Sequence, residues 1–166
     1  MTIRSSFHHI GLSVADLDRQ CRYYTEAFGF QEEYRTVIPE AGVRISFLTG
    51  PGGAALELTE RAGSTPQRFG DPLDGAGTQG YFHWALTVDD LGAVLAAAAA
   101  HGGRTVTPPA PALRPGTRFA YLADLEDNLI ELRQPARSRG GRSTAGARHG
   151  LVAPDRSGRP GARRRP

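Results

Sequence analysis

The sequence of 166 residues contains no lysine and only one cysteine, and it has no long apolar run. A single cysteine, Cys21, cannot form a disulfide within the chain, and its place in a helical pattern indicates a small core residue. No stretch approaches the ~20 apolar residues of a membrane span, and the N-terminus lacks the pattern of a secretory signal. We therefore expect a soluble, cytoplasmic protein of 39% hydrophobic residues, without membrane contact.

Because lysine is absent, all twenty basic residues are arginine, and they are unevenly distributed. Nine of them lie in residues 136–166 beside one acid, Asp155, so this segment carries a charge of +8 and residues 1–135 carry −5. Residues 135–166 are rich in Arg and Gly and poor in large apolar side chains, which predicts a disordered tail. No aromatic residue is interleaved with these arginines, so we expect an inert extension rather than nucleic-acid binding.

Two intervals of equal length organise the rest of the chain. The interval from His9 to Glu57 has the same length as the interval from His83 to Glu131, so one constant shift superimposes the first pair on the second. The same shift aligns further stretches of similar sequence, namely 9–14 with 83–88, 16–17 with 90–91, 44–48 with 118–122 and 56–58 with 130–132. This recurrence indicates a duplicated module.

Periodicity predicts the same β-α-β-β-β order in both halves. The first module is predicted to have strands and a helix at residues 7–14, 17–28, 31–37, 43–49 and 54–59. The second is predicted to have them at residues 81–88, 91–101, 104–107, 117–123 and 129–133. Asp16 is a suitable N-cap and Gly29 a suitable left-handed C-terminal residue for the first helix. The segment 108–111, Pro-Pro-Ala-Pro, is expected to be an extended loop.

The repeated histidines and glutamates are candidate ligands of one divalent metal ion. On the first strand of each half, the histidine shares its face with small side chains, Gly11 and Ser13 or Ala85 and Thr87, which favours a cavity over a packed core. A glutamate centred in a strand requires a cation, hydrogen bonds or water if it is buried. Modules related by a twofold axis would bring two imidazoles and two carboxylates together. This donor set suits Zn, Ni, Fe, Mn or Co, although strand glutamates are often solvated and strand histidines are often structural.

Several short motifs resemble those of the vicinal oxygen chelate superfamily, which includes glyoxalases, bleomycin resistance proteins and extradiol dioxygenases. They are His9-Ile10-Gly11-Leu12, Tyr23-Tyr24, Phe28-Gly29-Phe30, Val88-Asp89-Asp90-Leu91 and Asn128-Leu129-Ile130-Glu131-Leu132. The resemblance implies an α+β fold in which two tandem βαβββ modules form a curved mixed sheet around a metal-binding cleft. Residues 1–134 would form this domain, with modules at about 6–60 and 80–134 joined by a linker at 61–79.

Within that superfamily, the ligand set His9, Glu57, His83 and Glu131 is similar to that of glyoxalase I. The resemblance implies a metal-dependent lyase or isomerase that transfers a proton on a small substrate chelated through vicinal oxygens. Glu131 is the expected base and Glu57 its counterpart, and a homodimer is the expected assembly. The cleft would lie within one chain or between exchanged modules of the dimer. The alternatives are an Fe(II)-dependent dioxygenase of the same superfamily and a drug-binding resistance protein without catalysis.

Two features depart from the glyoxalase pattern. The turn before the last ligand usually reads Asp-Pro-x-Gly-Asn in this superfamily, whereas residues 124–128 here are Asp-Leu-Glu-Asp-Asn. Asp and Asn tolerate left-handed backbone geometry, so the turn is expected to survive. No glutathione-binding signature is evident. Arg44 and Arg118 are related by the repeat and are either holders of a substrate carboxylate or ordinary surface residues.

Overall fold

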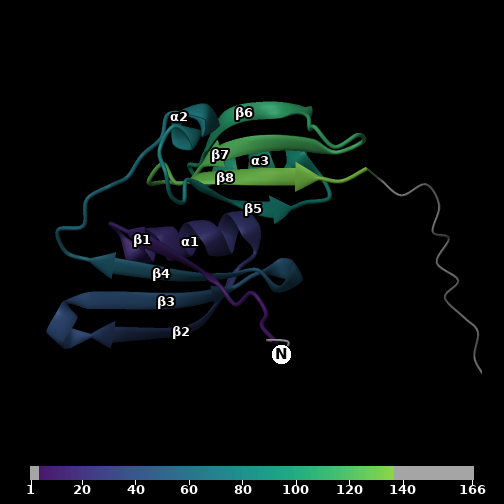
Figure 1. Ribbon diagram of the computed structural model, residues 1–166. Helices are drawn as coiled ribbons and strands as arrows, with labels where there is room; N and C mark the ends of the chain where they lie inside the picture. Colours follow the sequence, from purple (N-terminus) through teal and green to yellow (C-terminus); the bar gives the residue numbers. More distant parts are fainter. Residues whose placement is uncertain (1–3, 137–166) are drawn as a thin grey trace, which may run out of the picture. The chain divides into compact units, whose positions relative to one another are not determined.

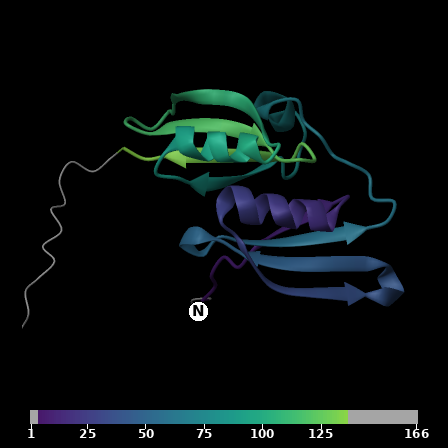
Figure 2. The same cartoon turned by 180° about the vertical axis from the view of Figure 1, so that it is seen from behind.

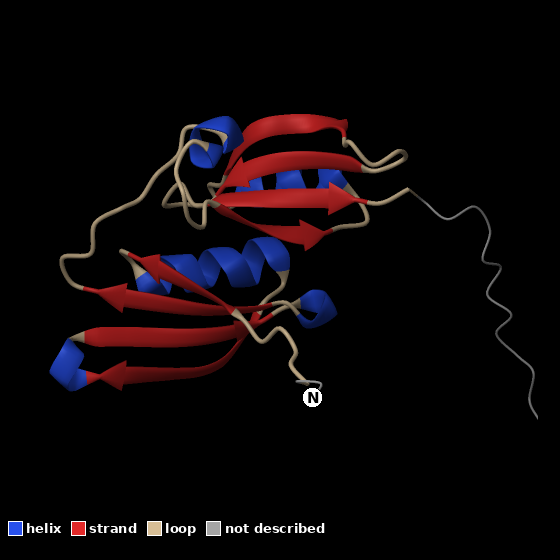
Figure 3. Ribbon diagram, viewed as in Figure 1, coloured by secondary structure: helices blue, strands red, loops and turns tan. Residues whose placement is uncertain are grey.

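The computed structural model describes residues 4–136. The predicted tail therefore lies, apart from its first two residues, outside the described part of the chain. Figures 1 and 3 show an α+β arrangement in which each half of the chain forms a four-stranded sheet with a helix. This confirms the predicted fold of two βαβββ modules. None of the helices within residues 4–136 combines the length and apolar character that a membrane crossing requires.

The first module follows the predicted order of elements. Its members are β1 (Ile10–Val14), α1 (Leu17–Phe28), β2 (Gln31–Ile38), β3 (Val43–Thr49) and β4 (Ala55–Arg61), with short 3-10 turns at Pro39–Ala41 and Pro51–Gly53. The Asp16 side chain accepts a hydrogen bond from the main-chain N–H of Arg19, and Gly29 ends α1 with a φ of 71°. The predicted cap residues therefore set both ends of the helix.

The sheet order of the first module is β1-β4-β3-β2, with β1 parallel to β4 and the other pairs antiparallel. Successive side chains along a strand point to opposite faces of the sheet. The face toward α1 carries Leu56 and Leu58, which are almost fully buried, whereas Glu57 between them is only half-buried. The module thus packs one face on its helix and leaves the other face to polar and aromatic side chains.

The second module repeats this plan. Its members are β5 (His83–Thr87), α3 (Leu91–Ala100), β6 (Arg104–Pro111), β7 (Arg118–Ala123) and β8 (Leu129–Gln134), in the sheet order β5-β8-β7-β6. Figure 2 shows α3 lying across this sheet. Ile130 and Leu132 are fully buried, and Glu131 between them is half-buried. A short helix, α2 (Pro72–Ala76), lies in the connection between the modules.

Strand β6 is longer than the sequence predicts. The segment 108–111 was expected to be a loop, but β6 continues through it to Pro111. The register between β6 and β7 shifts between Thr107 and Ala110, and the two prolines between them have no paired residue on β7. The prediction was wrong because β6 is an edge strand, where a proline without an N–H donor is tolerated.

The two modules share one core. Helices α1 and α3 contact each other, and Tyr24 packs against Trp84 with ring centroids 6.0 Å apart. The Tyr24 hydroxyl donates a hydrogen bond of 2.8 Å to Asp124, a buried carboxylate of the β7–β8 turn. Burial, together with Asp124, raises the pKa of Tyr24 well above its usual value, so the hydroxyl remains a donor.

The β7–β8 turn also holds the start of α1. Glu126 accepts hydrogen bonds from the main-chain N–H groups of Ala15 at 2.7 Å and Asp16 at 3.0 Å. Asp127 adopts a φ of 66°, the one positive φ of a non-glycine residue among residues 4–136. The prediction that an aspartate can replace the usual glycine in this turn is therefore confirmed.

Candidate metal and substrate site

In the first module, the predicted ligands lie on the sheet face opposite α1. His9 directly precedes β1, and its ring packs edge-on against Phe47 at 5.5 Å. Glu57 lies at the centre of β4, in register with Gly11 on one side and Phe47 on the other. Gly11 has no side chain, and a Cβ added there would meet no atom within 4 Å, so there is open space beside Glu57 on the β1 side.

In the second module, the predicted ligands are in contact. His83 opens β5, and Glu131 occupies the centre of β8, in register with Ala85 and Tyr121. His83 Nε2 lies 3.4 Å from Glu131 Oε2. Two donors that bind one ion at about 2.1 Å lie about 3.0–3.4 Å apart in octahedral or tetrahedral geometry. The His83–Glu131 pair therefore has the separation expected of two ligands of one metal ion.

The four predicted ligands do not form one cluster in a single chain. Within residues 4–136, no group of three or more His, Cys, Asp or Glu side chains is arranged to hold a metal ion. The chain on its own thus offers two half-sites of one histidine and one glutamate each, and only the second pair is in contact. Two protein donors leave an ion bound largely by water, so a firm site requires further ligands.

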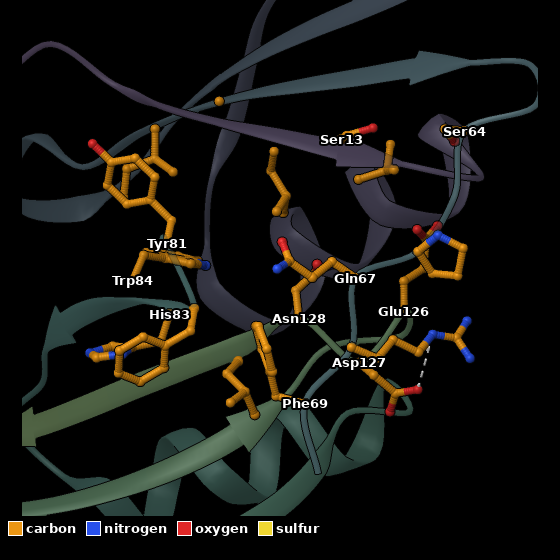
Figure 4. Close-up of a pocket in the computed structure, with 18 of the residues that line it drawn as sticks. Ser13, Ser64, Gln67, Phe69, Tyr81, His83, Trp84, Glu126, Asp127 and Asn128 are labelled. Carbon is orange, nitrogen blue, oxygen red and sulfur yellow. Dashed lines mark ion pairs between the residues drawn. The ribbon is translucent and has the colours of Figure 1, made fainter. Parts of the chain in front are cut away.

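Both histidines line a cavity of about 840 Å³, whereas neither glutamate does. Figure 4 shows Tyr81, Trp84 and His83 on one side of this cavity and Glu126 and Asp127 on the other. The cavity lies between β1 and β5, each of which is one of the two edge strands of its sheet. Arg68 and Asp127, which both line the cavity, form an ion pair with Nε 3.7 Å from Oδ2, marked by the dashed line in Figure 4.

Aromatic side chains form part of the lining of this cavity. Its lining includes Phe7, Phe69, Tyr81, Phe82 and Trp84, and Phe7 and Tyr81 are 78% and 99% exposed. Exposed aromatic groups beside unpaired strand edges are typical of surfaces that bind another protein or a ligand. The sequence pattern predicts the part of this lining that comes from His9, Gly11 and Ser13, but not the part from residues 64–69, because the connection between the modules has no periodic pattern.

Two further residues adjoin Glu131 on the open face of the second sheet. Tyr121 is its cross-strand neighbour on β7, and Arg133 follows it by two positions on β8, with Nε 3.8 Å from Glu131 Oε1. Burial first, and then the carboxylate of Glu131, raise the pKa of Tyr121. The alternation of side chains along a strand predicts this neighbourhood, since positions two apart share a face.

Arg44 is occupied elsewhere. It donates hydrogen bonds of 3.1 Å to both carboxylate oxygens of Glu60 and one of 2.8 Å to Asp18. The sequence left two interpretations of Arg44 open, a holder of a substrate carboxylate and an ordinary surface residue. These ion pairs support the second. Arg118 is exposed at the start of β7 and alternates onto the face opposite Glu131.

The fold and these paired residues define a member of a known family. Residues 6–132 match the model of the Glyoxalase/Bleomycin resistance protein/Dioxygenase superfamily, and the chain belongs to this superfamily. Curated relatives include the lactoylglutathione lyase of Arabidopsis thaliana, 30% identical over 131 residues. That alignment covers 77% of this chain and 44% of the relative. A Vibrio parahaemolyticus protein named "Probable lactoylglutathione lyase" is 32% identical over 130 residues, covering 76% of this chain and 88% of the relative.

Solved structures of glyoxalase I have a similar fold. The crystal structure of glyoxalase I from Zea mays superimposes with a TM-score of 0.63 at 27% identity, covering 78% of this chain and 44% of that one. The chain therefore spans less than half of the plant proteins that it matches. The bacterial relative, in contrast, is close to this chain in extent.

Proposed function

We propose that this protein is a metal-dependent lyase/isomerase of the glyoxalase I type, acting on the hemithioacetal of a 2-oxoaldehyde and a thiol. The observation that carries the proposal is the contact of His83 with Glu131 at 3.4 Å, repeated in sequence by His9 and Glu57. The relatives named lactoylglutathione lyase support the same reaction class. The proposed reaction implies that the substrate is a small molecule.

The complete site would be assembled from two chains. A single chain presents its two half-sites separately within residues 4–136, and both β1 and β5 are free edge strands. In a twofold homodimer, each contact between different surfaces occurs twice. His9 and Glu57 of one chain would then meet His83 and Glu131 of the other at two equivalent sites. Of the two arrangements considered from the sequence, the separate half-sites favour this one.

His9, Glu57, His83 and Glu131 would hold one divalent ion, of Zn, Ni, Fe, Mn or Co. When bound, such an ion supplies positive charge that acidifies the C–H group next to the substrate oxygens. Glu131 would act as the base that carries the proton between neighbouring carbons, with Glu57 as its counterpart. The side chain of Glu131 is only 20% exposed, so most of it is removed from solvent.

The test combines metal content with turnover. Protein purified without added metal is examined by elemental analysis, and hemithioacetal isomerisation is then assayed with several thiols. Loss of a positioned general base costs about 10²–10⁴ in rate, so Glu131→Gln should lower kcat by that factor. Glu40→Gln is the matched control, because Glu40 is exposed in the 3-10 turn after β2.

Three results would contradict the proposal. Unchanged turnover in Glu131→Gln would remove the assigned base. Oxygen uptake with Fe(II) and no isomerisation would favour the dioxygenase alternative. Tight binding of a drug without turnover, unaffected by a chelator, would favour the resistance-protein alternative, for which the cavity of about 840 Å³ offers space.

A further inference from the structure

Two neighbouring histidines are in contact just before the first strand. His8 Nδ1 lies 2.7 Å from His9 Nδ1, and the two rings meet edge to face with centroids 5.0 Å apart. Both rings also pack against Phe47, with centroids 5.8 Å away for His8 and 5.5 Å away for His9. Because Phe47 is the cross-strand partner of Glu57, the histidine pair lies on the same sheet face as the other predicted ligand of this half-site.

The contact between the two rings is a hydrogen bond and not shared coordination of one ion. Two donors bound to an ion at about 2.1 Å lie about 3.0–3.4 Å apart, whereas these nitrogens are 2.7 Å apart. The shorter separation is typical of a hydrogen bond, in which one nitrogen carries the proton and the other accepts it. Each Nδ1 is therefore engaged by the other, and the nitrogen of His9 that remains free for an ion is Nε2.

The direction of this hydrogen bond decides whether His9 can bind a metal ion. An imidazole binds metal through an unprotonated nitrogen, and a ligand histidine usually donates its other N–H to a neighbouring acceptor. If His9 Nδ1 carries the proton, His9 Nε2 has a free lone pair. If His8 is the donor, the neutral ring of His9 carries its proton on Nε2 and cannot bind an ion there. Only the first arrangement prepares the half-site for an ion.

The second half of the chain has no equivalent hydrogen bond. The shift that aligns His9 with His83 aligns His8 with Phe82, whose ring packs on His83 at 4.4 Å and has no acceptor atom. Among residues 4–136, His83 Nδ1 is buried without a hydrogen-bond partner. Its Nε2 instead contacts Glu131 at 3.4 Å. The two half-sites therefore share their ligand types and differ in the residue beside the histidine.

We infer that His8 is a positioning residue for the metal site: it accepts a hydrogen bond from His9 Nδ1 and so holds His9 in the tautomer whose Nε2 binds the ion. This inference rests on the proposed function, which makes His9 a ligand. His8 acts only through His9 and is not itself a ligand. It thereby prepares the half-site in which histidine and glutamate are not in contact.

The first test determines the tautomer directly, in metal-free protein at a pH of about 8.5, where an ordinary imidazole is neutral. Long-range ¹H–¹⁵N spectra distinguish a protonated Nδ1 from a protonated Nε2, and single-site variants assign the signals of His8 and His9. We expect the His9 proton on Nδ1 in the unaltered chain and on both nitrogens in turn in His8→Phe. A His9 ring of the unaltered chain that is protonated mainly on Nε2, or equally on both nitrogens, would overturn the inference.

The second test measures the Kd for Zn²⁺ by competition with a chromophoric chelator. His8 is exposed, so its replacement leaves the core intact. Loss of the hydrogen-bond partner of a ligand histidine weakens metal binding about 10–100-fold, and His8→Phe should raise the Kd by that factor. His8→Asn should stay within about threefold of the unaltered chain, because the amide oxygen of asparagine, like Nδ1 of histidine, is bonded to Cγ and accepts a hydrogen bond.

His101→Phe is the matched control for the loss of an exposed imidazole. His101 ends α3 and forms an ion pair with Glu26, so its replacement should not change the Kd. An unchanged Kd in His8→Phe would overturn the inference. So would a His8→Asn variant that binds as weakly as His8→Phe, since a residue that is itself a ligand would give this result.

The two tests separate this inference from the proposed function. Zn²⁺ binding and turnover by a chain whose His9 is protonated on Nε2 would contradict the role of His8 and leave the proposed function standing. Zn²⁺ binding without hemithioacetal isomerisation would contradict the proposed function, while the tautomer and the Kd values still decide the role of His8. An unaltered chain that binds no Zn²⁺ would contradict both.

Discussion

Replacing Tyr24 by phenylalanine removes one hydroxyl from the buried junction between the modules. This hydroxyl donates to Asp124 Oδ2 at 2.8 Å, and both residues are almost fully buried. The rest of the Asp124 carboxylate is satisfied within its own turn, by the main-chain N–H groups of Glu126 and Asn128 and by the Asn128 side chain. The substitution therefore deletes the one hydrogen bond of this carboxylate that comes from the other module.

A hydrogen bond to a charged group contributes about 1.5–3 kcal/mol to stability. Because the Asn128 side chain still donates to Oδ2 at 2.9 Å, the carboxylate oxygen is not orphaned in the variant. We therefore expect Tyr24→Phe to lower the free energy of unfolding by about 2 kcal/mol, in the middle of that range. The aromatic ring remains, so its contacts with Trp84 and Phe30 are kept.

Urea unfolding followed by circular dichroism measures this loss. Tyr34→Phe is the matched control, because Tyr34 is 49% exposed on β2 and its hydroxyl makes no hydrogen bond within residues 4–136. An exposed substitution of this kind changes stability by less than about 0.5 kcal/mol. If Tyr24→Phe is as mild as Tyr34→Phe, the Tyr24–Asp124 bond does not connect the modules energetically, and the reasoning fails.

Two further predictions concern stability. Gly103→Ala should lower the free energy of unfolding by about 1–3 kcal/mol in urea titration, because the added Cβ would lie 2.2 Å from the hydroxyl oxygen of the buried Tyr23. Gly11→Ala, where a Cβ meets nothing within 4 Å, should cost less, and a larger cost there would contradict the packing argument. Asp18 has a pKa lowered from 3.8 to about 2, chiefly by a hydrogen bond from Arg44. A lowered pKa stabilises the fold above pH ~4, and this contribution disappears as the pH falls toward ~2. Asp18→Asn should therefore show a smaller drop in Tm across that window, and an unchanged drop would refute this assignment.

Much of the fold could be predicted from residue patterns. The alternation around His9 and Glu57 identified the strands and their buried faces, because only a pleated strand places every second residue in the core. The capping residues Asp16 and Gly29 gave the helix ends, since each has a specific local conformation. Asp127 in the β7–β8 turn was predictable for the same local reason.

Contacts between distant segments could not be predicted. Glu126 accepts hydrogen bonds from the main-chain N–H groups of Ala15 and Asp16, just before α1 and far from it in the sequence, and a glutamate in a turn has no pattern that indicates such a partner. The repeat placed His83 and Glu131 at equivalent positions to His9 and Glu57. It could not show whether the modules of one chain bring all four together, because internal symmetry is satisfied equally by one chain and by a dimer.

The most direct test of the two-chain site is complementation between variants. Glu57→Gln damages the first half-site and Glu131→Gln the second, so each homodimer should be inactive. When the two proteins are unfolded together and refolded, about half of the dimers are mixed, and each mixed dimer has one intact site and one doubly altered site. We expect recovery of about a quarter of the unaltered activity, because half of the dimers are mixed and half of their sites are intact. Refolded mixtures that stay as inactive as the separate variants, although mixed dimers form, would contradict a site shared between chains.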